Sequence, residues 1–130
     1  MTVIAATLAI TVVWTYLTVI PVGYARRKME RGYNNVNPRD QQALLTGWGK
    51  RAHAAHLNAF EALIVFAATA AVVIATGKVS PYAPSLCAAF LASRVVFEVC
   101  YLANWPRTRS AMWFIGFVAC LGLILGAFCK

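Results

Sequence analysis

Four long apolar stretches dominate this sequence and restrict the folds open to it more than any other feature does. They run from Thr2 to Ala25, from Ala52 to Thr76, from Tyr82 to Trp105 and from Ser110 to Cys129. Each supplies roughly the 20 residues that an α-helix needs to cross about 30 Å of hydrocarbon. Lipid offers the backbone no hydrogen-bond partners, so only helices and closed barrels cross it. Because these stretches are too long and continuous for barrel strands, the sequence predicts an all-α membrane protein.

The composition agrees with a chain that lies in lipid. Of the 130 residues, 61% are hydrophobic and 12% are charged, whereas an average soluble domain has about 45–50% apolar and about 25% charged residues. A single domain of this size cannot bury so much apolar surface inside itself. The composition therefore excludes an ordinary soluble globule, a disordered chain and a collagen-like fibre.

The connections between the apolar stretches indicate how the helices are arranged. Gly77–Pro81 and Pro106–Arg109 are short and contain strong helix breakers, and short connections place consecutive helices antiparallel. We expect a single domain, residues 1–130, folded as an up-down bundle of four transmembrane helices with a loop at 26–51. The first stretch has no basic region before it and no clear cleavage site, so we expect a permanent span and not a signal peptide.

The net charge of +8 fits a membrane topology better than a nucleic-acid partner. Seven of the twelve Lys and Arg residues lie between Arg26 and Arg51, whereas a nucleic-acid-binding protein spreads them over a contact surface. Only Lys78 and Lys130 lie on the opposite side of the predicted bundle. By the positive-inside rule, the 26–51 loop faces the cytoplasm and both termini face away from it. No targeting signal distinguishes a cell inner membrane from the endoplasmic reticulum.

Ionisable side chains inside membrane spans are rare and costly, which makes them candidate functional residues. Glu61 lies in the second predicted span, and Arg94 and Glu98 lie in the third. Because these two helices run antiparallel and each residue adds 1.5 Å, Glu61 and Arg94 reach about the same depth. We therefore expect a Glu61–Arg94 ion pair. A purely structural pair is the alternative, although apolar packing would join the helices at a lower desolvation cost.

The helical faces that carry Glu61 and Arg94 carry further polar side chains, because positions three, four and seven apart share a face. With the cations of the rim, this set consists of Arg26, Arg51, Asn58, Glu98, Tyr101 and Arg109. We expect these residues to form a polar funnel that opens to the cytoplasm. Arginine near a thiol lowers the thiol pKa and raises its thiolate fraction. The funnel thus suits a small anionic or thiol ligand together with a lipophilic molecule or lipid from the bilayer.

Cysteine and histidine are not spaced for metal binding. The four cysteines, Cys87, Cys100, Cys120 and Cys129, lie in apolar stretches without a C-x-x-C pair. His53 and His56 point to the side of their helix opposite Asn58, and no third ligand stands at a suitable spacing. We expect buried cysteines, packing histidines and no metal site.

Two motifs resemble those of a known family. The run from Arg51 to Glu61, RAHAAHLNAFE, resembles the second-span signature of the membrane-associated proteins in eicosanoid and glutathione metabolism (MAPEG). The run from Arg94 to Ser110 resembles the third-span and loop signature of that family, and Asn37-Pro38 and Arg26 also fit. The resemblance covers nearly the whole chain and is of the microsomal glutathione transferase type. It implies a four-helix subunit, a homotrimer, and glutathione bound between subunits near the cytoplasmic ends of the helices.

The resemblance also implies roles for individual residues. Those expected to hold the co-substrate glutathione are Arg26 (from a neighbouring subunit), Arg51, Asn58, Glu61, Arg94 and Tyr101. Arg109 matches the arginine proposed to stabilise the thiolate, and Ser110 matches the serine that follows it in the prostaglandin-forming branch. Two positions depart from the pattern: Ala54 replaces an arginine found in many glutathione-binding relatives, and Phe97 replaces a histidine or tyrosine found in some. Losing one bidentate arginine contact costs about 1.5–3 kcal/mol.

Three functions are compatible with these residues. The first is a glutathione-dependent transferase or peroxidase for lipophilic electrophiles that arrive from the bilayer. The second is a non-catalytic lipid-binding or scaffold protein of the same family, which Ala54 favours. The third is a small proton-coupled exporter, which the first span does not favour because it has no ionisable residue before Arg26. The sequence does not identify the electrophile or the lipid.

Overall fold

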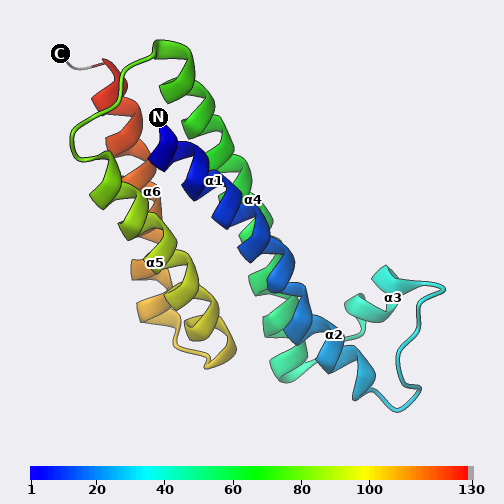
Figure 1. The fold of residues 1–130 in the computed structure, drawn as a ribbon. Helices are drawn as coiled ribbons and strands as arrows, with labels where there is room; N and C mark the ends of the chain where they lie inside the picture. Colours follow the sequence, from blue (N-terminus) through cyan, green and yellow to red (C-terminus); the bar gives the residue numbers. More distant parts are fainter. Residues whose placement is uncertain (129–130) are drawn as a thin grey trace.

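The computed structural model describes residues 1–128. All regular secondary structure within these residues is helical. The helices are α1 (Thr2–Leu17), α2 (Val19–Arg27), α3 (Pro38–Ala43), α4 (Gly47–Thr76), α5 (Ala83–Leu102) and α6 (Pro106–Phe128). Since α1 and α2 form one continuous segment, four helical segments are long and apolar enough to cross a membrane (Figure 1). The predicted all-α fold is confirmed. Cys129, the last residue of the fourth predicted span, lies outside the described residues.

The four long segments alternate in direction. In Figure 1 the chain runs from the N-terminus through α1 and α2, returns along α4, and then turns back in α5 and again in α6. The segment of α1 and α2 packs against α4, and α4 packs against both α5 and α6. The N-terminus and the end of α6 therefore lie at one end of the bundle. The loop that contains α3 lies at the other end, where the short turn between α5 and α6 also lies.

The helix of the first membrane segment is interrupted where α1 passes into α2. Pro21 has no N–H and its ring clashes with the carbonyl of the residue four positions earlier, Leu17. The helix ladder is accordingly interrupted at Thr18, which keeps a helical backbone with φ −65° and ψ −10°. The segment continues to Arg27, two residues past the predicted end at Ala25.

The turn between α5 and α6 is built by Asn104 in the left-handed conformation, with φ 60°. The N–H of Trp105 donates to the carbonyl of Cys100 at 2.8 Å, and the N–H of Asn104 donates to the carbonyl of Tyr101 at 3.2 Å. This pair of bonds is the Schellman motif, which ends a helix sharply. Pro106 then begins α6. The tight turn brings the last turn of α5 close to the first turn of α6.

The interface between α1 and α4 is polar. Thr7, Thr11, Thr15 and Thr18 are all buried. The hydroxyl of Thr15 donates to the carbonyl of Thr11 at 2.8 Å and lies 3.3 Å from that of Ala59 on α4. Thr18 shares a 2.8 Å hydrogen bond with Nδ1 of His56. Small polar side chains of this kind let membrane helices approach closely, and His56 is engaged in this packing.

Candidate functional site

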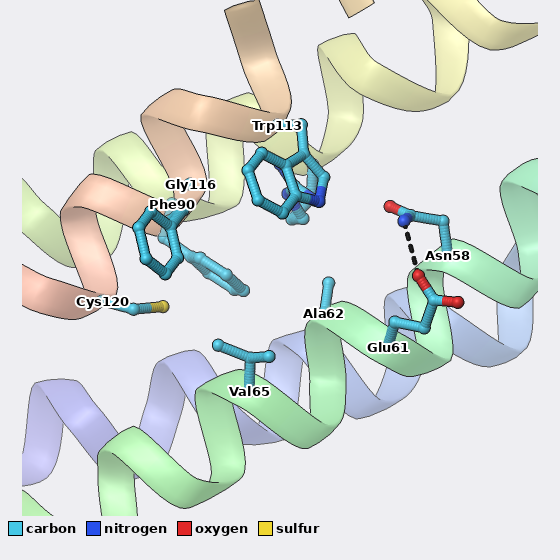
Figure 2. A pocket seen from close by; sticks show the side chains of 10 residues that line it. Asn58, Glu61, Ala62, Val65, Phe90, Trp113, Gly116 and Cys120 are labelled. Carbon is cyan, nitrogen blue, oxygen red and sulfur yellow. Dashed lines mark hydrogen bonds between the residues drawn. The ribbon is translucent and has the colours of Figure 1, made fainter. Parts of the chain in front are cut away.

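A cavity of about 130 Å³ lies between α4, α5 and α6. Its polar residues are Asn58, Glu61 and Arg94. Its remaining lining is mostly apolar: Ala62, Val65, Phe90, Trp113, Gly116, Phe117 and Cys120. Figure 2 shows Asn58 and Glu61 on one side of this space and Phe90 and Cys120 on the other. The cavity therefore offers polar contacts at one end and apolar contacts at the other.

The expected Glu61–Arg94 ion pair does not form. Both side chains nevertheless line the same cavity, in agreement with the similar membrane depth expected for them. Oε2 of Glu61 accepts a hydrogen bond from Nδ2 of Asn58 at 2.8 Å on its own helix (Figure 2). The guanidinium of Arg94 donates instead to the carbonyl of Met112 at 2.9 Å and to Oγ of Ser93 at 3.3 Å. Ideal helix geometry gives the depth of a long side chain but not the direction in which it extends, and α6 offers Arg94 an acceptor.

Arg94 is only 7% exposed, and its surroundings fix its position. A Cβ at Gly116 would lie 2.7 Å from a guanidinium nitrogen of Arg94 and 2.8 Å from Oγ of Ser93, so only glycine leaves room for this arrangement. The guanidinium carbon lies 5.0 Å from the ring centroid of Phe97, within cation–π distance. Phe97, one of the two departures from the family pattern, therefore supports Arg94.

A second cavity, of about 260 Å³, adjoins the first and shares Asn58 and Trp113 with it. Phe97, Tyr101, Arg109 and Ser110 complete its lining. The guanidinium carbon of Arg109 lies 4.3 Å from the ring centroid of Tyr101, so the cation stacks on the ring. The hydroxyl of Ser110 donates to the carbonyl of Pro106 at 3.0 Å. The α5–α6 turn thus brings the third-span and loop motifs to one cavity.

Arg26 does not line these cavities within one chain, and it organises the loop after α2. Its Nε donates to Oε1 of Gln41 at 2.9 Å, and another guanidinium nitrogen donates to the hydroxyl of Tyr33 at 3.1 Å. A third bond goes to the carbonyl of Asn34. With these partners Arg26 is buried, at 5% exposure. A contribution of Arg26 to the site of a neighbouring subunit stays a prediction.

Arg51 joins α4 to the end of α5. A terminal nitrogen of Arg51 lies 3.3 Å from the carbonyl of Leu102, to which it donates, and its Nε is buried without a partner among residues 1–128. The residue lies on α4 because this helix begins at Gly47, five residues before the predicted start at Ala52. Arg51 lines neither cavity, and seven residues, about two helix turns, separate it from Asn58.

The contribution of α6 was not predicted in detail. From α6, Gly116, Phe117 and Cys120 line the first cavity, and the carbonyl of Met112 accepts the bond from Arg94. The fourth apolar stretch has no charge after Arg109, so it gave no signal of a functional face. Trp113 lines both cavities. Among residues 1–128, no group of three or more His, Cys, Asp or Glu side chains is placed to hold a metal ion.

The comparison with family models gives one result for this chain. Residues 4–129 match the model of the MAPEG family, so the match includes all four membrane segments and both cavities. Neither the curated proteins nor the solved structures contain a match. Together with the four apolar helices, the match makes the chain a multi-pass membrane protein whose function is related in general to glutathione or eicosanoid metabolism. The chain belongs to the MAPEG family.

Proposed function

We propose that this protein is a glutathione-dependent transferase or peroxidase of the microsomal glutathione transferase type, acting on lipophilic electrophiles from the bilayer. The observation that carries the proposal is that Arg109 and Asn58 line one cavity, which adjoins the cavity of Glu61 and Arg94. Under this proposal the chain forms a homotrimer, and the loop at 26–51 faces the cytoplasm, from which glutathione enters.

The charges along the two cavities complement those of glutathione, which has two carboxylates, one ammonium group and a thiol. Glu61 supplies an anion for the ammonium group, and its Oε1 is not used by Asn58. Arg94 supplies a cation for a carboxylate, since a guanidinium has five N–H donors and two of its nitrogens are bonded to protein. Ala54 leaves the second carboxylate without the arginine found in many relatives, so we expect weak binding.

Arg109 is the residue proposed to act on the thiol. Within residues 1–128 its guanidinium has no hydrogen-bond partner, and it stacks on Tyr101. A positive charge beside the sulfur stabilises the thiolate, and the thiol proton leaves to water. The thiolate then attacks the electrophile, a carbon–sulfur bond forms, and the leaving group departs with its electron pair. Ser110 Oγ retains lone pairs that accept the S–H proton as a hydrogen bond before ionisation, since its own hydrogen is donated to Pro106.

The apolar side of the first cavity is the proposed place for the electrophile. Val65 on α4 and Phe117 on α6 line the cavity and are 46% and 41% exposed. The space therefore reaches the outer surface of the bundle between two membrane helices. A lipophilic molecule dissolved in the bilayer has a short path from there to the polar end of the cavity.

A non-catalytic lipid-binding or scaffold protein is the second candidate function, and Ala54 favours it. Conjugation of glutathione to chlorodinitrobenzene, measured on protein purified in detergent, distinguishes the two. We expect turnover in the wild type and a loss of about 100-fold in Arg109→Ala, the size of effect seen when a charge-stabilising donor is removed. Arg107→Ala, at an exposed position in the same turn of α6, is the matched control and keeps the wild-type rate. Glutathione binding with no conjugation supports the second candidate.

A further inference from the structure

A small chamber of about 10 Å³ lies beside the first cavity, between α1, α4 and α5. It shares Asn58 and Arg94 with that cavity, and Glu98 also lines it. The wall from α1 includes Thr11 and Thr15. A space of this size holds about one water molecule.

Two residues that line this chamber each have a buried acceptor atom without a partner. Oε1 of Glu98 has no hydrogen bond among residues 1–128, and Glu98 is only 6% exposed. Oδ1 of Asn58 is also buried and unbonded, because Asn58 uses its Nδ2 to reach Glu61. Buried acceptors of this kind are bonded in nearly all native proteins, to protein or to ordered water. Two acceptor oxygens cannot bond to each other, so they need a donor between them.

The hydroxyl groups in the chamber wall are already used. Thr11 donates to the carbonyl of Thr7 at 2.7 Å, and Thr15 donates to that of Thr11 at 2.8 Å. Arg94, in contrast to these threonines, still has available donors. It donates through Nε and one terminal nitrogen, and the N–H groups of its other terminal nitrogen are not bonded to protein. The chamber is therefore lined by residues with two unpaired acceptors and by Arg94 with available N–H groups, which is the environment of a buried water that makes about three hydrogen bonds. Trp14 also lines the chamber, and its indole N–H has no hydrogen-bond partner among residues 1–128.

We propose that one water molecule in this chamber donates to Glu98 Oε1 and to Asn58 Oδ1 and accepts from Arg94. Glu98 then acts as a positioning residue. With Oδ1 held toward the chamber, the Asn58 amide cannot turn over, so its Nδ2 points at Glu61 and fixes that carboxylate. This role of Glu98 does not depend on an ion pair with Arg94, which lies one turn earlier on α5.

The effect of Glu98 on glutathione rests on the proposed function and is tested by affinity and kinetics. We expect Glu98→Leu to weaken glutathione binding about tenfold, from the loss of one buried hydrogen-bonded link. It raises KM for glutathione and leaves kcat unchanged, because Glu98 does not touch the thiol. Glu98→Gln stays within about threefold of the wild type, since its amide oxygen accepts the same hydrogen bond. Glu30→Gln, on the exposed loop, is the control.

A double-mutant cycle shows whether Glu98 acts through Asn58. If it does, Asn58→Ala and the Asn58→Ala/Glu98→Leu double variant bind glutathione equally weakly. Additive losses overturn the proposal, as they show two independent roles. A Glu98→Gln variant as defective as Glu98→Leu also overturns it, because the carboxylate charge and not the hydrogen bond is then required.

A measurement without glutathione tests the water bridge itself. Asn58 is the one asparagine within the four membrane segments, so its side-chain amide is identified readily in protein labelled with ¹⁵N-asparagine. We expect slow exchange of the Asn58 amide hydrogens with solvent in the wild type and Glu98→Gln, and faster exchange in Glu98→Leu. Equal exchange in all three overturns the bridge. If the bridge is observed but the wild type does not bind glutathione, the proposed function fails and the bridge stands.

Discussion

Replacing Gly116 with alanine tests how α6 positions Arg94. The new Cβ would lie 2.7 Å from a terminal nitrogen of Arg94 and 2.8 Å from Oγ of Ser93, closer than a real Cβ approaches such atoms. The atoms in its way are the ends of side chains, so we expect the helices to stay packed. The guanidinium must instead move and give up its 2.9 Å bond to the carbonyl of Met112.

The magnitudes follow from this displacement. A hydrogen bond made by a charged group contributes about 1.5–3 kcal/mol, and alanine in place of glycine returns about 0.5–1 kcal/mol in a helix interior. We expect Gly116→Ala to lower the free energy of unfolding by about 0.5–2.5 kcal/mol. Because Arg94 leaves the position proposed for a glutathione carboxylate, we also expect affinity for glutathione to fall about tenfold, which corresponds to about 1.4 kcal/mol.

Thermal unfolding and glutathione titration of the purified variant measure these two effects separately. Gly122→Ala is the matched control on the same helix, since its Cβ would meet only the flexible side chain of Leu86, at 3.1 Å. We expect Gly122→Ala to bind glutathione like the wild type. A Gly116→Ala variant with wild-type affinity would show that Gly116 does not set the position of Arg94 for ligand binding.

Three further predictions follow from single contacts. Asn104→Val lowers the free energy of unfolding by about 1–2 kcal/mol, because a β-branched residue is strained at φ 60°. Asn104→Gly does not lower it, and denaturant unfolding midpoints of the two variants measure the difference. Gln41→Leu removes the acceptor of Arg26 Nε, at a cost of about 1–3 kcal/mol, and makes the loop after α2 more sensitive to limited proteolysis than the wild-type loop. Phe97→Leu removes the ring 5.0 Å from the Arg94 guanidinium and weakens glutathione binding by about 0.5–2 kcal/mol, whereas Phe97→Tyr retains the ring and the affinity; titration of both variants measures the difference.

The membrane helices were predictable because hydropathy and length are properties of the local sequence. The interruption at Thr18 also has a local cause in Pro21, but the helix α3 was not predicted, since Pro38–Ala43 is too short for a periodic signal. Its position depends on bonds made by the buried Gln41, which no pattern in the sequence indicates.

The grouping of polar residues on α4 and α5 was predictable in part, because Arg51 lies outside both cavities, and their bonding was not predictable. Helical periodicity and depth brought Asn58, Glu61 and Arg94 to one cavity, as expected. The prediction of a Glu61–Arg94 ion pair was wrong because the partner of Arg94 depends on the space that Gly116 leaves on α6. A long flexible side chain follows the nearest acceptor in the folded bundle, and the sequence alone does not specify which helix provides it.

Calorimetric titration of glutathione into the wild-type protein in detergent, with Glu61→Gln alongside, measures whether the two cavities bind glutathione. We expect saturable binding by the wild type with a Kd near or below about 1 mM. We expect binding about tenfold weaker in Glu61→Gln, which loses the charge facing the ligand ammonium group. No saturable binding by the wild type at millimolar glutathione would rule out the proposed glutathione site and would make Ala54 the decisive departure from the family pattern.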